Sequence, residues 1–141
     1  MKISVIGLGI YSLAISKALA KNKNNKIVIW TENPKKLEEF KETKKLISIV
    51  DTDIPKNISI TTSIKEAVED TSIIYIITAS KYVDITVDKI KPYYNKNTPI
   101  CIASKGIEES REELLSNIVK NTLKTNNIAV ISGPTFAIDI I

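Results

Sequence analysis

A short segment near the start of the chain has the residue types and the spacing of a phosphate-binding turn. GLGIYS (7–12) follows an apolar run and opens a stretch with helical spacing, and an acidic residue ends the next apolar run, twenty residues after Ser12. A first glycine permits a tight turn, a second lets the backbone approach a pyrophosphate, and the amide groups that start the helix face its negative charge. The spacing predicts a dinucleotide site. Its candidate cofactor-binding residues are Gly7, Leu8, Gly9, Ile10, Tyr11, Ser12 and Glu32.

Glu32 also indicates which dinucleotide binds. A carboxylate at the end of the second strand accepts hydrogen bonds from the adenosine ribose hydroxyls and repels a 2′-phosphate. This position therefore predicts NAD(H) as the preferred cofactor over NADP(H). The alternative is that Glu32 is a surface glutamate in the turn WTENP (30–34).

The first twenty residues also fit a secretory leader. Lys2 supplies a charged start, residues 3–15 form an apolar run, and Ala18-Leu19-Ala20 has the A-x-A form of a cleavage site. Removal of such a leader would leave a chain that begins KNKNNK and lacks the strand at the centre of the predicted sheet. The strand, turn and helix are therefore the favoured interpretation.

Short runs rich in Ile and Val are predicted to be the strands that carry this site. They are bounded by Asn, Pro, Gly, Ser or Thr, and several are apolar at nearly every position, as a parallel strand covered on both faces requires. The runs are KISVIG (2–7), KIVIW (26–30), ISIT (58–61), IIYIIT (73–78), PICIAS (99–104) and IAVIS (128–132).

Stretches with helical spacing separate these runs. Helices are predicted over Tyr11–Lys21, over Pro34–Glu42 after the cap Asn33, over IKEAVE after Ser63 with a capping box to Glu66, and over Glu109–Leu123. Alternation of strand and helix implies right-handed crossovers. The expected fold class is α/β, a Rossmann-type doubly wound, mainly parallel sheet with helices on both faces, in one dinucleotide-binding domain over residues 1–141.

The composition excludes several other kinds of site. The chain has no histidine, which excludes a histidine base and a His-ligated metal, and its single cysteine, Cys101, excludes an internal disulfide and a cysteine-rich zinc site. The net charge of +4 comes from lysines scattered among acidic residues, which favours solvated helix faces over a nucleic-acid surface. No apolar run after residue 20 reaches the length of a membrane span. We expect no metal, nucleic-acid or membrane partner, and a cytoplasmic location.

Along its whole length the sequence resembles the NAD(P)-dependent glycerol-3-phosphate dehydrogenase family. The resemblance is carried by GLGIYSLA, IVIW, the stretch from IPKN to ITAS, and most specifically by ASKGIEE and AVISGPTFA. It implies that Lys105 lies beside the nicotinamide and the substrate, and that Gly133, Thr135 and Ala137 contribute to the substrate and cofactor pocket. Lys105, Gly133 and Thr135 would position the substrate. The alternatives are a solvent-facing lysine and plain turn residues.

Five positions modify the expected site. Tyr11 takes the family's aromatic position in the glycine loop, and Tyr82 follows TAS where the family commonly has V-P-S or V-P-H. Either ring borders the cofactor or packs against the core, and packing is favoured for Tyr82. Ser12 replaces the third glycine or alanine and is expected to loosen the loop, while Ile10 replaces a serine that contacts the pyrophosphate. Glu32 replaces a basic residue common in bacterial members.

The resemblance also implies a second domain. In the family a later lysine is the general acid/base and a helical carboxy-terminal domain completes the phosphate site, both beyond Ile141, so we expect no catalytic residue and no turnover from residues 1–141. The complete enzyme interconverts sn-glycerol 3-phosphate and dihydroxyacetone phosphate with NAD(H), and a homodimer would form through the second domain. The alternatives are a truncated, inactive dinucleotide-binding module and another nicotinamide-dependent enzyme of the hydroxyacid or ketopantoate type.

Overall fold

Six parallel strands form the central sheet in the computed structural model, which describes residues 1–46, 48–108, 112–133 and 136–141. The strands are β1 (Lys2–Ile6), β2 (Lys26–Trp30), β3 (Ile58–Thr61), β4 (Ile73–Ile76), β5 (Ile100–Ile102) and β8 (Ile128–Val130). They lie in the order β3-β2-β1-β4-β5-β8, with Ile3 of β1 opposite Ile27 of β2 and Ile73 of β4. The order reverses between β1 and β4, which is where open α/β sheets bind ligands. The six predicted strands and the fold class are confirmed.

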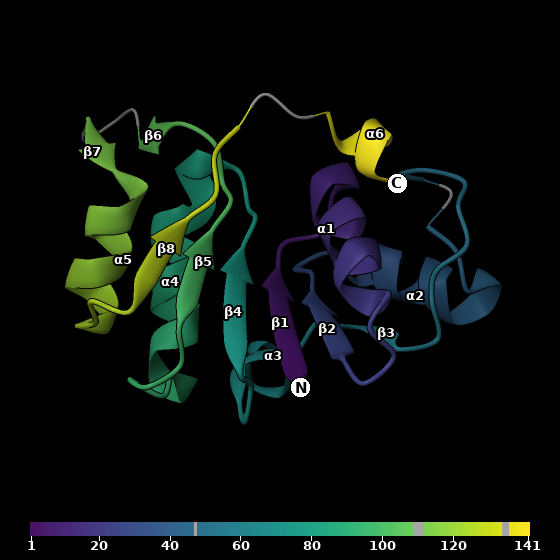
Figure 1. The fold of residues 1–141 in the computed structure, drawn as a ribbon, viewed down its shortest axis with the longest axis horizontal. Helices are drawn as coiled ribbons and strands as arrows, with labels where there is room; N and C mark the ends of the chain where they lie inside the picture. The colour runs from purple at the N-terminus through teal and green to yellow at the C-terminus, as the bar shows by residue number, and fades with distance from the viewer. Residues whose placement is uncertain (47, 109–111, 134–135) are drawn as a thin grey trace.

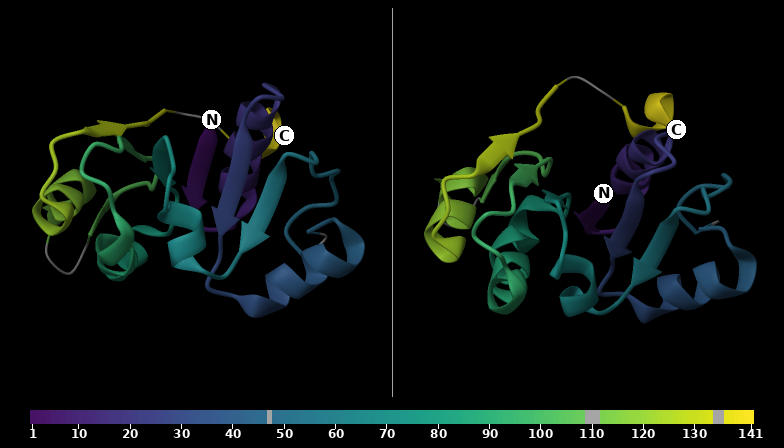
Figure 2. Two further views of the ribbon diagram at one scale, coloured as in Figure 1. Left: turned by 90° about the horizontal axis from the view of Figure 1, so that it is seen from below. Right: turned by 60° about the horizontal axis from the view of Figure 1, so that its bottom comes forward.

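Helices cover both faces of this sheet, as Figures 1 and 2 show. On one face lie α1 (Ile10–Ala20) and α2 (Pro34–Thr43), and on the other α3 (Ile64–Val68), α4 (Val83–Ile90) and α5 (Leu115–Leu123). The 3-10 turns η1 (Ser80–Tyr82) and η2 (Lys91–Tyr93) flank α4. The last helix, α6 (Ala137–Ile140), packs on α1, so the end of the chain lies over the first helix (Figure 1).

Cap residues determine where two of the helices begin. The side chain of Asn33 accepts a hydrogen bond from the Lys35 amide at 3.0 Å, and Pro34 takes the first helical position. The Ser63 hydroxyl accepts from the Glu66 amide at 3.2 Å. The Glu66 carboxylate, however, accepts from the Thr61 hydroxyl at 2.6 Å, and the same Thr61 oxygen takes the Ser63 amide at 3.0 Å. The predicted capping box therefore forms only in its serine half.

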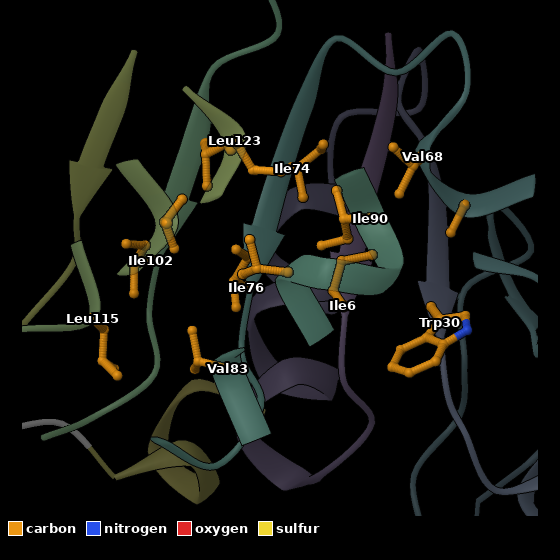
Figure 3. Packing of buried hydrophobic residues seen from close by; sticks show 14 of the residues in the cluster. Ile6, Trp30, Val68, Ile74, Ile76, Val83, Ile90, Ile102, Leu115 and Leu123 are labelled. Carbon is orange, nitrogen blue, oxygen red and sulfur yellow. The ribbon is translucent and has the colours of Figure 1, made fainter. Parts of the chain in front are cut away.

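The strands send alternate side chains to two buried apolar clusters. One cluster, drawn in Figure 3, lies under α3, α4 and α5 and includes Ile6 of β1, Ile76 of β4 and Ile102 of β5. The other lies under α1 and α2 and includes Val5 of β1 and Ile29 of β2. Because successive strand residues point to opposite faces, both faces need apolar residues, which explains the nearly continuous Ile and Val runs.

The segment before α5 differs from the prediction. The helix begins at Leu115, whereas the sequence predicts a start at Glu109, which lies outside the described residues. A small antiparallel pair of strands, β6 (Ile107–Glu108) and β7 (Glu113–Leu114), precedes it, and Glu112 has a φ of 51° that no helix interior accepts. Among the described residues of this segment, 112–114 are therefore not helical, and α5 begins at Leu115.

Candidate functional site

Three pockets lie in a row over the carboxyl ends of the strands. The β2 pocket, about 370 Å³, lies between the glycine loop, the end of β2 and the start of α4. The central pocket, about 380 Å³, lies between the start of α1 and the ends of β4 and β5. The β8 pocket, about 230 Å³, lies between the ends of β5 and β8. Residues 77–79 line both the β2 and the central pocket, and Tyr11 and residues 103–105 line both the central and the β8 pocket, so the three form one continuous groove.

The two glycines of the loop face different surroundings. Gly7 has a φ of +109°, and a Cβ placed there would lie 2.8 Å from the Ile77 carbonyl oxygen at the end of β4. Its amide donates to the Trp30 carbonyl at 3.0 Å, so the turn is tied to β2. Gly9, by contrast, is extended, and a Cβ there would meet nothing within 4 Å. The fold therefore requires glycine at position 7, whereas position 9 faces open space in the β2 pocket.

Ser12 fits into the helix start through hydrogen bonds. It is buried, its hydroxyl accepts from the Gly9 amide at 2.7 Å, and the same hydroxyl donates to the Gly9 carbonyl at 2.9 Å. The Leu13 amide also bonds the Gly9 carbonyl, at 3.0 Å, and thereby begins α1. The hydroxyl at the third motif position thus links the loop to the first turn of α1, and the loosening expected from Ser12 is not what the structure shows.

The end of β2 meets α4 in the β2 pocket. Glu32 lines this pocket, with 73 % of its side chain exposed, and its Oε1 accepts a hydrogen bond from the ammonium group of Lys89 on α4. The same ammonium lies 5.7 Å from the centre of the Trp30 ring. The Trp30 indole Nε1 donates to the Thr62 carbonyl at 3.1 Å, which fixes the ring beneath the pocket. The predicted carboxylate therefore lies in the groove with a cation already paired to it.

Lys105, from the second half of the chain, lies beside Tyr11 of the glycine loop. It follows β5, lines both the central and the β8 pocket, and its ammonium lies 5.6 Å from the centre of the Tyr11 ring, a cation–π distance. Ile10, which is exposed, and Ala137 at the start of α6 line the central pocket beside this pair. Gly133 lines the β8 pocket. Thr135 lies outside the described residues.

Tyr82 lies at the opposite end of the groove from Lys105. The residue is 52 % exposed and lines the β2 pocket, and the Lys81 ammonium lies 5.0 Å from the centre of its ring. The packed position favoured for Tyr82 is therefore wrong. Leu8, together with Gly7 and Gly9, also lines the β2 pocket.

Two residues at or beside the groove, Lys89 and Thr78, are not among those predicted from the sequence. Lys89 reaches Glu32 from a helix that was not predicted, fifty-seven positions along the chain, so no local motif points to it. Thr78, at the boundary of the β2 and central pockets, has a buried hydroxyl without a hydrogen-bond partner. A polar residue at the end of a predicted parallel strand was the available signal for Thr78.

Two ionisable groups on neighbouring strands of the sheet, the buried Cys101 and the partly buried Tyr75, have raised pKa values. Burial raises the pKa of the Cys101 thiol on β5. Tyr75 on β4 lies opposite Cys101 in the sheet. Its pKa is raised mainly by burial and to a smaller extent by the neighbouring Cys101. Among the described residues no group of three or more His, Cys, Asp or Glu is placed to hold a metal ion. Within those same ranges no helix combines the length and apolar character needed to cross a bilayer.

Comparison with known proteins identifies similar sequences over the whole chain. Residues 2–141 match the family model described as NAD-dependent glycerol-3-phosphate dehydrogenase N-terminus. A glycerol-3-phosphate dehydrogenase [NAD(P)+] of Thermoanaerobacter sp. (strain X514) is 36 % identical over 141 residues, and its counterpart in Wolbachia pipientis subsp. Culex pipiens is 35 % identical over 140 residues. These alignments cover 100 % and 99 % of this chain and 42 % of each relative.

Solved structures give the same architecture. The crystal structure of glycerol-3-phosphate dehydrogenase from Coxiella burnetii superposes with a TM-score of 0.91 at 24 % identity, over 99 % of this chain and 42 % of that one. At this identity the likeness shows the fold. The chain thus spans 42 % of the length of these relatives.

Proposed function

This chain belongs to the NAD-dependent glycerol-3-phosphate dehydrogenase family, as its amino-terminal part, and we propose that it binds NAD(H) along the groove described above. The observation that carries the proposal is the open space at Gly9 beside the start of α1, where a side chain is sterically allowed yet absent. A pyrophosphate approaching this backbone would face the amide groups of the helix start. Family membership removes the hydroxyacid and ketopantoate alternatives.

The two ends of the dinucleotide have different surroundings under this proposal. The adenosine lies in the β2 pocket, where Glu32 accepts hydrogen bonds from the ribose hydroxyls and repels a 2′-phosphate. The relatives are named for both NAD and NADP, so the preference for NAD(H) rests on Glu32. The nicotinamide lies in the central pocket, between Tyr11 and Lys105.

The reaction we propose for the complete enzyme is the interconversion of sn-glycerol 3-phosphate and dihydroxyacetone phosphate. Bound NAD(H) supplies or accepts the hydride. Lys105 orients the substrate through its ammonium, which attracts a carbonyl or phosphate oxygen, and Gly133 leaves room for the substrate in the β8 pocket. Thr135 would add a hydroxyl beside it. Proton transfer belongs to a residue outside this chain. The inactive-module alternative shares only the binding of the dinucleotide.

Two further expectations come from the family resemblance alone. A cytoplasmic location and a homodimer formed through a second domain both belong to the proposal. Cell fractionation and sedimentation of the complete enzyme test them.

Titration of the purified chain with NADH tests the cofactor proposal. The only tryptophan, Trp30, lies in the β2 pocket and reports binding by fluorescence. We expect Gly9→Val to weaken NADH binding at least tenfold, about 1.4 kcal/mol, since the added methyls occupy the approach of the pyrophosphate. Ala18→Val, on the exposed side of α1, is the matched control and should bind as the wild type does. Equal binding by Gly9→Val, or no binding by the folded wild type, contradicts the proposal.

A further inference from the structure

The Lys89–Glu32 ion pair lies where cofactor choice is decided, if the dinucleotide binds as proposed. Lys89 is in the last turn of α4, its ammonium donates to Glu32 Oε1, and the same ammonium lies over the Trp30 ring, 5.7 Å from the ring centre. The Lys89 side chain is 35 % exposed and that of Glu32 73 % exposed. The cation is therefore held at a defined place beside the carboxylate and still reaches solvent.

The helix that carries Lys89 forms one wall of the β2 pocket. Tyr82, just before α4, and Thr86, one turn into it, both line this pocket, and Lys89 follows Thr86 by three residues. Residues three and four apart share a helix face. Lys89 therefore lies on the same side of α4 as Thr86, and its ammonium reaches Glu32 just after the end of β2.

Other lysines near this pocket have different contacts. The Lys36 ammonium donates to the Ser48 hydroxyl at 3.0 Å, and that of Lys81 lies over the Tyr82 ring. In the part of the chain that the structure describes, Lys89 is the cation within ion-pair distance of Glu32.

We propose that Lys89 is a specificity-determining residue that lets the adenosine site accept a 2′-phosphate in spite of Glu32, an inference that rests on the proposed function. With NADH, a ribose hydroxyl donates to Glu32 while Lys89 stays paired to Oε1. With NADPH, the ammonium leaves the carboxylate and pairs with the 2′-phosphate, whose double negative charge attracts it more strongly. Glu32 therefore sets the preference for NAD(H), and Lys89 limits its size.

Small adenosine ligands test this proposal without the nicotinamide end. Adenosine 5′-monophosphate and adenosine 2′,5′-bisphosphate differ only in the 2′-phosphate, and calorimetry measures their dissociation constants alongside those of NADH and NADPH. Lys89→Met keeps a flexible, unbranched side chain and removes the charge, Lys89→Arg keeps the charge, and Lys91→Met removes an exposed charge just after α4.

We expect Lys89→Met to weaken binding of the bisphosphate and of NADPH about tenfold, since a charge-assisted contact to the phosphate is lost. Binding of the monophosphate and of NADH should change less than about twofold, because Glu32 keeps its ribose contacts. Lys89→Arg should retain the wild-type ratio, and Lys91→Met should leave it unchanged.

The outcomes separate this inference from the function on which it rests. Equal loss of both adenosine ligands in Lys89→Met, or no loss of the bisphosphate, overturns the role of Lys89 while dinucleotide binding stands. A folded wild-type chain that binds neither nucleotide overturns the proposed function itself. Circular dichroism of each variant confirms that differences in binding are not differences in folding.

Discussion

The two ends of the groove differ in how completely this chain encloses them. The β2 pocket is lined by the glycine loop, the end of β2 and the start of α4, and an ion pair links Glu32 after β2 to Lys89 in the last turn of α4. Val130, which lines the β8 pocket, is 59 % exposed, and Phe136, which lines the central pocket, is 76 % exposed. Apolar residues this exposed are available to further protein or ligand atoms. The β2 pocket, to which we assign the adenosine, is therefore organised by contacts within the chain, whereas the walls at the end assigned to the substrate include exposed apolar side chains.

The largest expected effect is a difference in stability between alanine substitutions at Gly7, in the β2 pocket, and at Gly133, in the β8 pocket. Gly7→Ala should lower the free energy of unfolding by about 3 kcal/mol, because it combines an unfavourable φ with a clash against the Ile77 carbonyl. Gly133→Ala meets nothing within 4 Å and should change stability by less than about 0.5 kcal/mol. Urea denaturation followed by circular dichroism measures both. Similar losses in the two variants would contradict the difference between the ends.

A second change tests the charge of the enclosed end. Glu32→Gln should reduce the preference for NADH over NADPH about tenfold, about 1.4 kcal/mol, since the neutral amide no longer repels the 2′-phosphate. The dissociation constants of both nucleotides give the ratio. Glu69→Gln is the matched control, because Glu69, the residue just after α3, pairs with Lys65 of α3 at 3.7 Å, and neither residue lines the pocket. A ratio that stays at the wild-type value would show that Glu32 does not discriminate.

A third change tests the open end. Lys105→Met should weaken NADH binding about threefold, about 0.6 kcal/mol, because an exposed cation beside Tyr11 contributes modestly to holding the nicotinamide end. Adenosine 5′-monophosphate should bind as tightly as to the wild type, since it reaches only the β2 pocket. Calorimetry with both ligands checks this. Parallel loss of the two ligands would mean that Lys105 acts on the whole loop and not on one end.

The smallest expected effect concerns Cys101 on β5, the strand that leads to residues 103–105 of the central and β8 pockets. Burial raises the pKa of Cys101 above its ordinary value of 9.0, so the thiol ionises more readily in the unfolded chain than in the folded one. The resulting stability is present below pH 9 and is lost as the pH rises through the folded value. Stability measured at pH 8 and pH 10 should therefore fall more in the wild type than in Cys101→Ala. Equal falls would show that β5 is accessible to solvent.

The strands were predictable because the apolar residues that each strand needs lie within a few consecutive positions of the sequence. Each strand of a doubly covered parallel sheet needs apolar residues on both faces, and runs such as KIVIW meet that need within five residues. Helix α4 was missed because VDITVDKI carries several β-branched residues, whose helix propensity is low, and packing of Val83, Val87 and Ile90 into the core decides its conformation.

The glycine loop and the acidic residue after β2 were predictable for a similar reason, whereas the ion pair was not. The spacing of Gly7 and Gly9 is a property of one turn, and strand length fixes where Glu32 lies. Lys89 meets Glu32 only because α4 packs beside α3, which itself contacts β2, and this arrangement depends on the order of strands and helices in the fold. The predicted start of α5 was wrong because Glu113 and Leu114 pair with β6, and this pairing competes with the helix that their spacing indicates.

The position of β1 also has a consequence for synthesis of the chain. In the finished sheet β1 has neighbours on both sides, with Ile3 opposite Ile27 and Ile73. At about 5–20 residues per second, translation supplies β4 roughly 4 to 14 s after β1 has left the peptidyl-transferase centre. Until then an Ile-rich strand presents unpaired amide and carbonyl groups, the feature that makes nascent chains prone to association. One of the two central strands of the native sheet is therefore an exposed edge during translation.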